Sequence, residues 1–262
     1  MKALTFVVRF TTAQFKDHMQ KLVRRTYLIP PPSAVAGFYG AILGLSRSDL
    51  KNLSKKIWAG AELRRFDGRG VSLARLFKFS QPADRLKTHL EAYFNGSRDK
   101  EILKEIQGLQ TIKESEELFM PEYKFAIAST NEKLIDEGLE RIRNYDFEYE
   151  VYGGNDYHFV EYISDPRLAQ VSKSLEGCGY CPREDFEHVL ADQYSIVRDI
   201  DFVKELTHPI VIPVMFLADV RKEFIQVYGA KIRVKRELDA VDDGESKIFV
   251  YNLEPFFVTH VG

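Results

Sequence analysis

Two cysteines and six histidines carry the widest range of chemistry in this 262-residue chain. Cys178 and Cys181 form a C-x-x-C pair, a spacing that occurs in zinc sites and in redox centres. Structural zinc needs four ligands, but there is no second cysteine pair, and His188 is the only additional ligand close by. We therefore expect a reduced turn without metal or cofactor. A zinc-dependent assembly module and a redox site stay open as alternatives.

No other motif identifies a catalytic centre. The sequence contains neither a phosphate-binding P-loop nor the G-x-S-x-G turn of serine hydrolases, and no two histidines have metal-ligand spacing. The carboxylate-rich stretches show no fixed pairing. Metal-independent RNA cleavage needs only a positioned His, Lys or Tyr near a 2′-hydroxyl and leaves no fixed motif. A ribonuclease therefore stays open as an alternative.

Cations interleaved with aromatic residues in the first 80 residues give a stronger signal. Lysine and arginine bind phosphates, and exposed aromatic rings stack on unpaired bases. The three backbone amides of Ser33–Val35, at the start of a helix, would add a phosphate site. The alternative places Phe15 and Trp58 in the core and leaves the cations solvated. The pattern predicts these RNA-binding residues: Phe15, Lys16, Lys21, Arg24, Arg25, Tyr27, Ser33, Arg64, Arg65, Arg69 and Arg75.

The charge distribution agrees with that prediction. The net charge is only −2, but residues 1–80 hold 15 basic and 4 acidic side chains, a local charge of +11. The other residues hold 37 − 15 = 22 basic and 39 − 4 = 35 acidic side chains, or −13. Such asymmetry favours a polyanionic partner for the first part of the chain. With 45% hydrophobic residues, the composition is that of a globular protein and excludes disorder, collagen and coiled coils.

The sequence offers no membrane span and no signal peptide, so we expect a soluble cytoplasmic protein without membrane contact. Two cysteines make no disulfide framework, which agrees with that compartment.

The pattern of elements predicts an α+β fold. Strands are expected at 3–10, within 57–80 around a turn at 67–70, and at 122–130, with further strand material at 147–163. Helices are expected at 33–45, capped by Ser33, and at 131–144, capped by Asn131. Glycines in the first helix indicate close packing on a sheet. Residues 192–262 are strand-rich, with short strands at 224–225 and 231–235.

This order resembles a ferredoxin-like (RRM-like) βαββαβ core, a fold in which many sheets bind single-stranded RNA. The core and its insertion would occupy residues 1–165. The insertion itself would cover about 81–118, and a C-terminal β-rich region would cover 166–262.

The proline and glycine positions of one segment make the prediction of function more specific. Residues 25–44 (RTYLIPPPSAVAGFYGAILG) resemble the N-terminal signature of the CRISPR-associated Cas-five family, within the RAMP superfamily. Residues 121–156 resemble a later segment of that family. There, Gly153-Gly154-Asn155-Asp156 replaces the more usual Gly-Arg-Ser. The two matches together cover about residues 1–165.

The resemblance implies a subunit of a type I Cascade surveillance complex. Such a subunit binds the 5′ handle of the CRISPR RNA and caps the backbone beside the large subunit. The insertion would then be a thumb that packs on the neighbouring backbone subunit. The implied partners are CRISPR RNA, the backbone and large subunits and, through the assembled complex, target DNA.

Relatives in type I-C systems resemble this family but process the repeat RNA themselves, with a tyrosine and a Lys-His arrangement. This chain contains no Lys-His dipeptide. The sequence therefore favours a non-catalytic subunit of an I-B-like system, in which a separate enzyme cuts the RNA. The endoribonuclease remains the alternative.

Overall fold

The computed structural model describes residues 1–17, 24–77, 83–96, 110–154, 157–190, 209–216 and 222–256. Its helices, with the 3-10 turns η1 and η2, are α1 (Pro32–Leu43), α2 (Arg47–Leu53), η1 (Ser54–Lys56), α3 (Ala83–Phe94), α5 (Glu132–Asn144) and η2 (Glu254–Phe256). Its strands are β1 (Lys2–Phe10), β2 (Thr12–Ala13), β3 (Phe15–Lys16), β4 (Thr26–Tyr27), β5 (Ile57–Arg65), β6 (Gly68–Phe77), β7 (Gln110–Phe119), β8 (Glu122–Ser129), β9 (Val160–Pro182), β10 (Phe186–Leu190), β11 (Ile210–Phe216), β12 (Lys222–Asp242), β13 (Lys247–Phe249) and β14 (Tyr251–Asn252).

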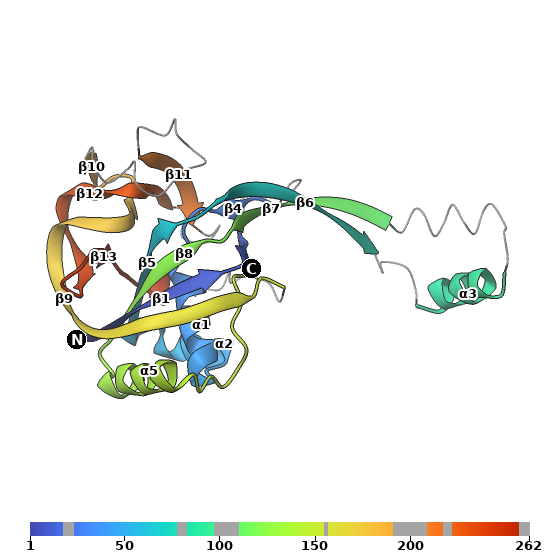
Figure 1. The fold of residues 1–262 in the computed structure, drawn as a ribbon, viewed down its shortest axis with the longest axis horizontal. Coiled ribbons are helices and arrows are strands. Elements are labelled where there is room, and N and C mark those ends of the chain that lie inside the picture. Colours follow the sequence, from blue (N-terminus) through green and yellow to red (C-terminus); the bar gives the residue numbers. More distant parts are fainter. Residues whose placement is uncertain are drawn as a thin grey trace.

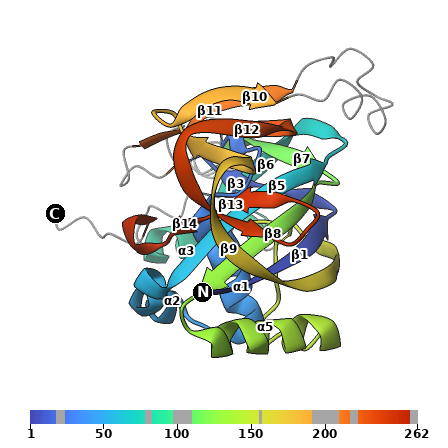
Figure 2. The same ribbon diagram turned by 90° about the vertical axis from the view of Figure 1, so that its left-hand side faces the viewer.

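Four antiparallel strands form the centre of the largest sheet, in the order β9-β1-β8-β5 (Figure 1). In the chain, α1 lies between β1 and β5, and α5 lies between β8 and β9. Both helices lie on the same side of the sheet, as Figures 1 and 2 show. The protein is therefore a strand-rich α+β protein, the class that the sequence predicted.

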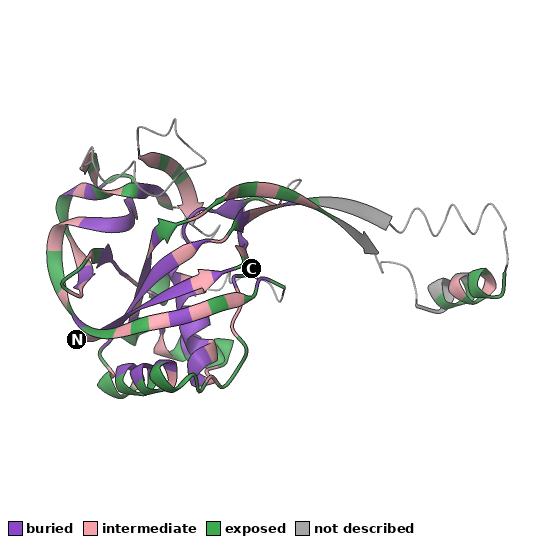
Figure 3. Ribbon diagram, in the orientation of Figure 1, coloured by how far each residue is buried: buried purple, intermediate pink, exposed green. Residues whose placement is uncertain are grey.

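Alternate side chains of the central strands enter two different layers. Phe6 and Phe125 belong to the large hydrophobic core, which also takes in Ile135 of α5. Ala3 and Ala126 point the other way and pack with residues of the C-terminal strands. Because both faces are covered, the central strands are almost continuously apolar, and buried residues concentrate there (Figure 3). This explains why β1 and β8 were the easiest strands to predict.

The strands β6 and β7 form a ribbon that projects from the body of the molecule (Figures 1 and 3). The sequence predicted strands on either side of a turn at 67–70. Instead, β5 stays in the central sheet while β6 leaves it and pairs with β7 along its whole length. Gly68 has a φ of +147°, a conformation that residues with a side chain rarely adopt, and it allows this change of direction. The projecting ribbon therefore begins at residue 68, ahead of the range of about 81–118 expected for the insertion.

The C-terminal strands continue the central sheet. The predicted boundary between residues 165 and 166 falls inside β9, which runs on to pair with β12. The short strands expected at 224–225 and 231–235 are parts of this single strand β12. Gly60 of β5 permits β13 to approach closely, since a Cβ on this glycine would lie 2.0 Å from the carbonyl oxygen of Phe249. No helix among the described residues is both long and apolar enough to cross a membrane.

Residues 147–159 differ from the sequence prediction as well. Strand material was expected from residue 147, but the described part of this stretch holds only an isolated bridge between Tyr152 and Phe159 before β9 begins. Gly154 lies here with a φ of +109°, and a Cβ on it would lie 1.9 Å from the carbonyl oxygen of Gln14. The glycine lets this loop pack directly on the backbone that leads into β3.

Candidate nucleic-acid interface

The segment with the proline–glycine signature is fixed by side chains from distant strands. The backbone N–H groups of Leu28 and Ile29 donate to Oε1 of Gln226 at 3.2 and 3.3 Å. Nε2 of Gln226 donates to the carbonyl of Ile29 at 2.7 Å, and the Tyr123 hydroxyl donates to the carbonyl of Leu28 at 2.9 Å. Buried peptide groups need such partners. Gln226 of β12 and Tyr123 of β8 therefore determine the course of the chain before α1.

Two aromatic residues predicted to stack on bases are buried. Phe15 is 6% exposed and packs edge-on against Tyr123, with ring centroids 5.6 Å apart. Tyr27 is 2% exposed, and its hydroxyl donates to the carbonyl of Met215 at 2.5 Å. A ring stacks on a base through an exposed face, so the stacking prediction does not fit the burial of Phe15 and Tyr27. They are core residues that support the basic segment around them.

Helix α1 begins without the predicted serine cap. Pro31 is the N-cap and Pro32 takes the first helical position, where the missing N–H of proline has no helical partner to lose. Ser33 is therefore a residue of the first turn rather than the cap. The N–H groups of Ala34 and Val35 donate to the carbonyl of Pro31 at 2.9 and 3.2 Å. Two of the three amides predicted to bind phosphate are thus already used within the chain.

The glycines of α1 have three different surroundings. A Cβ on Gly40 would lie 2.9 Å from the side chain of Leu50, so this glycine allows α2 rather than the sheet to approach. Gly44 ends the helix in the left-handed conformation, with a φ of +73°, as its position predicted. A Cβ on Gly37 would meet nothing within 4 Å. The helix backbone is therefore open to a groove at Gly37.

That groove has a volume of about 580 Å³ and lies along α1. It brings together three of the predicted site residues, Phe15, Lys16 and Ser33. Arg47 and Tyr149 also line it, although the sequence analysis selected neither. The local signal for Arg47 is the capping box of Ser46, which indicates that a new helix starts at Arg47, directly after the end of α1. Nothing in the local sequence pointed to Tyr149.

Arg24 and Arg25 lie beside Lys16 because β4 pairs with β3. The backbone of Arg24 exchanges hydrogen bonds with β7, donating to Glu114 at 3.0 Å and accepting from Glu116 at 2.8 Å. Within the described residues, the side chains of Lys16, Arg24 and Arg25 have no acidic partner. Lys21 lies outside the described residues, and so does the side chain of Arg75, whose backbone pairs with Ile112 in the projecting ribbon.

The remaining predicted arginines are held by ion pairs away from the groove. Arg65 lies 3.5 Å from Asp67, and Arg69 lies 3.6 Å from Glu116. Arg64 lies 3.0 Å from Glu245, on the side of β5 that the C-terminal strands cover. The structure therefore does not gather all predicted cations into one surface, and part of the excess positive charge in residues 1–80 is neutralised within the fold.

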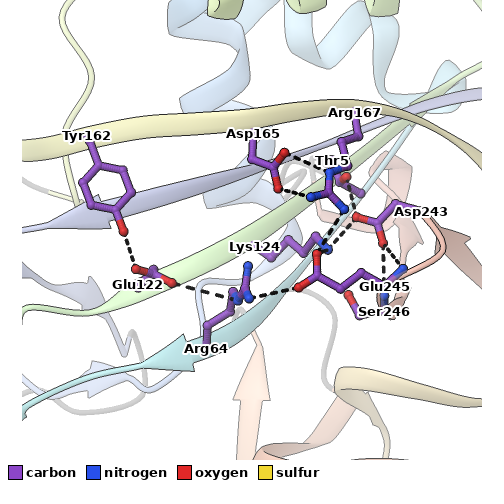
Figure 4. A network of polar contacts seen from close by, with 10 residues as sticks. All are labelled: Thr5, Arg64, Glu122, Lys124, Tyr162, Asp165, Arg167, Asp243, Glu245 and Ser246. Carbon is purple, nitrogen blue, oxygen red and sulfur yellow. Dashed lines mark hydrogen bonds and ion pairs between the residues drawn. The ribbon is translucent and has the colours of Figure 1, made fainter. Parts of the chain in front are cut away.

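Arg64 belongs to a network of polar contacts between the central sheet and the loop after β12 (Figure 4). At its centre, Nζ of the buried Lys124 lies 2.5 Å from Asp243 and 3.0 Å from Glu245. Thr5 also donates to Asp243 at 2.8 Å. Arg167 joins from β9, 3.2 Å from Glu245. The network fixes the loop to β8 and β1 and is structural rather than a ligand site.

The buried carboxyl of Asp243 predicts a loss of stability in acid. Burial alone would raise its pKa, but hydrogen bonds from Lys124, Thr5 and the backbone N–H groups of Ser246 and Glu245 outweigh burial and hold the pKa at about 2. Because the folded pKa lies below the unfolded value, this contribution is complete above about pH 4 and disappears as the pH falls towards 2. Urea unfolding between pH 5 and 2 is expected to show this decline, and Asp243→Asn should make it shallower. An equal slope in that variant would contradict the assignment.

The two cysteines are buried free thiols on β9. Burial, with a smaller contribution from Asp185, raises the pKa of Cys181 to about 12, and burial raises that of Cys178 further. A thiol with a raised pKa carries little of the thiolate that metal binding and redox chemistry need. Among the residues that the structure describes, no group of three metal-ligating side chains exists. Both cysteines are therefore core residues of a strand, and not part of the turn that the sequence predicted.

Comparison with known proteins identifies the family. A family model described as "CRISPR-associated protein (Cas_Cas5)" matches residues 3–171. The chain belongs to the Cas5 family. No curated protein sequence matches it. This assignment agrees with the resemblance carried by residues 25–44, and the matched range includes Lys16, Arg24, Arg47 and Tyr149.

Solved structures similar to this Cas5 family chain are distant in sequence. A chain of a "CRISPR RNA-guided surveillance complex" is 12% identical, with a TM-score of 0.43, covering 95% of this chain and 92% of that one. A CRISPR protein from Archaeoglobus fulgidus is 10% identical, with a TM-score of 0.47, covering 96% and 100%. A chain of a Type III-B Cmr-beta complex bound to cognate target RNA and AMPPnP is 15% identical, with a TM-score of 0.35, covering 89% and 86%.

Proposed function

We propose that this Cas5 family protein is a non-catalytic subunit of a type I, I-B-like CRISPR surveillance complex. It would bind the 5′ handle of the CRISPR RNA and cap the backbone beside the large subunit. The observation that carries the proposal is the position of Lys16, Arg24 and Arg25. All three lack an acidic partner among the described residues, and they lie at the entrance to the signature segment of the family. Cations without partners are available to neutralise phosphates.

The fold supports this role in a complex. The order β9-β1-β8-β5, with two helices on one side, supports the ferredoxin-like core that we propose. The ribbon of β6 and β7 would be the thumb. It exposes Val71 and Leu73, at 61% and 69%, and a two-stranded ribbon gains little stability by itself. We infer that the neighbouring backbone subunit covers it. Target DNA would be reached only through the assembled complex, which would act in the cytoplasm.

The surroundings of the two tyrosines in the signature segment 25–44, Tyr27 and Tyr39, support a non-catalytic role. The Tyr27 hydroxyl donates to the carbonyl of Met215 inside the protein. The Tyr39 hydroxyl donates to the carbonyl of Leu134 at 2.6 Å, and burial, together with Glu137 and Asp136, raises its pKa. Neither hydroxyl is free to approach a 2′-hydroxyl of RNA. The general acid–base step of a ribonuclease would need a residue with such access.

The triple variant Lys16→Ala, Arg24→Ala, Arg25→Ala tests the proposal. In the purified complex, we expect at least 10-fold weaker binding of the CRISPR RNA handle at physiological salt. The slope of log affinity against log salt should also become shallower, by up to about 0.7 for each lost phosphate contact. Binding is measured by filter retention or anisotropy over a salt series.

A control variant with the same change in charge is Lys133→Ala, Arg143→Ala, Lys173→Ala, whose three side chains are exposed elsewhere. This variant should bind the handle like the wild type. If both variants lose affinity and slope equally, the proposed contact is wrong and the effect is one of net charge alone.

A further inference from the structure

The groove along α1 has features that play no part in the proposed contact of Lys16, Arg24 and Arg25 with the handle. Ala34, Gly37 and Ala41 line it and lie three to four residues apart, so they share one face of the helix. Their small size, together with the open space at Gly37, leaves the helix backbone accessible. A volume of about 580 Å³ lies within the range of sites that enclose a small molecule, about 300–1,000 Å³.

Tyr149 contributes an aromatic side chain to the lining of this groove. The backbone N–H of Tyr149 donates to the carbonyl of Ala41 at 3.1 Å, and that of Glu148 donates to Ile42 at 3.2 Å. These bonds join the loop after α5 to carbonyls in the last turn of α1 and thereby fix the backbone of Tyr149. Its side chain is 56% exposed and has no hydrogen bond or ring contact within the described residues. An exposed ring on a fixed backbone can stack on a base.

The charged side chains that line the groove are cations. Among the described residues, Lys16 and Arg47 line it, and no acidic side chain does so. Neither has an ion pair within the described part of the chain, in contrast to Arg64, Arg65 and Arg69. The groove therefore combines an exposed ring, an accessible helix backbone and two cations. This combination matches the base and the phosphates of a nucleotide. The positive charge alone would also suit an acidic peptide, but the exposed ring favours a base.

We propose that the groove holds one unstacked nucleotide of a single-stranded RNA. Its base lies against Tyr149 and the α1 backbone at Gly37, and its phosphates contact Lys16 and Arg47. The inference rests on the proposed binding of CRISPR RNA and adds a base-binding position to it. With one base in the groove, affinity depends on the presence of a base at one position of the bound strand rather than on length alone.

The test uses the assembled complex with the full-length chain and a set of handle RNAs, each with one abasic position. With wild-type protein, one abasic position is expected to weaken binding about 10-fold. Gly37→Leu adds a side chain at a position that lines the groove and where a Cβ meets no atom within 4 Å, and Tyr149→Ala removes the ring. Both variants should bind the intact RNA about 10-fold more weakly and should be insensitive to that abasic position. Tyr157→Ala, an equally exposed tyrosine that does not line the groove, should behave like the wild type.

Thermal unfolding separates a filled groove from a damaged fold. Replacing a helical glycine usually stabilises a helix, so Gly37→Leu should unfold no earlier than the wild type. If the wild-type complex binds the handle but no abasic position matters, or if sensitivity persists in both groove variants, the base site is overturned and the proposed function still stands. If the wild-type complex binds no CRISPR RNA, the proposed function itself is overturned.

Discussion

Replacing Lys124 by methionine is expected to lower the free energy of unfolding by about 3–5 kcal/mol. The side chain of Lys124 is 1% exposed, and its ammonium lies 2.5 Å from the carboxylate of Asp243, whose side chain is wholly buried. Methionine keeps most of the apolar volume but removes the charge. It would leave the Asp243 carboxylate in the interior without its ammonium partner, and such an unpaired buried charge is strongly destabilising. Urea unfolding at pH 7 measures the effect.

An exposed ion pair provides a matched control. Lys173 of β9 lies 2.8 Å from Asp239 of β12, but its side chain is 58% exposed. Pairs of this kind contribute less than about 1 kcal/mol, so Lys173→Met should have little effect. Adding Asp243→Asn to Lys124→Met should recover part of the lost stability, because the unpaired charge is gone. Equal losses of unfolding free energy in Lys124→Met and Lys173→Met would show that the buried pair contributes no more to stability than the exposed one.

The location of this pair also predicts how the protein unfolds. Lys124 belongs to β8 in the centre of the sheet, and Asp243 follows the last residue of β12. The pair therefore joins the C-terminal strands to the core. Together with the continuous β9, it makes the predicted division at residue 165 a position inside one cooperative unit. We expect fluorescence and circular dichroism to report a single coincident unfolding transition.

Local patterns explain which elements the sequence predicts well. The apolar run of β1 and the helical spacing of Ile135, Leu139 and Ile142 in α5 are visible without any partner. The strand β9 is different, since much of its polar sequence is exposed and only its pairing with β1 and β12 defines it. Pairing over such distances leaves no local signature. This is why β9 and β12 were read as short pieces or missed.

The residues of the candidate site also fall into those that the local sequence reveals and those that it does not. Proline and glycine positions reveal the signature segment because these residues restrict the backbone locally. Which cations stay free, however, depends on acids far away in the sequence: Arg64 pairs with Glu245, 181 residues further on. Tyr149 enters the groove only because the turn after α5 caps the end of α1. Such residues become visible only once the tertiary contacts are known.

Replacing Gln226 by leucine is expected to lower the free energy of unfolding by about 3–5 kcal/mol. Gln226 is completely buried, and its amide makes three hydrogen bonds to the backbone of Leu28 and Ile29. Leucine has a similar volume but cannot hydrogen bond, so two N–H groups and one carbonyl would lose their partner in the interior. Tyr123→Phe removes only the bond to the carbonyl of Leu28 and should cost about 1–2 kcal/mol. Gln170→Leu, on the surface of β9, is the control and should be nearly neutral.

The same variant connects the C-terminal strands to RNA binding. Gln226 has no exposed surface and so cannot touch RNA itself, yet it holds Leu28 and Ile29, which lie between Arg25 and the start of α1. Handle affinity should therefore fall several-fold in Gln226→Leu, measured at a temperature where circular dichroism shows the protein folded, and should not change in Gln170→Leu. Unchanged affinity in the folded variant would mean that β12 stabilises the protein without positioning the RNA-binding segment. A loss of affinity would show that β12 positions the proposed RNA-binding segment from within the core, through Gln226.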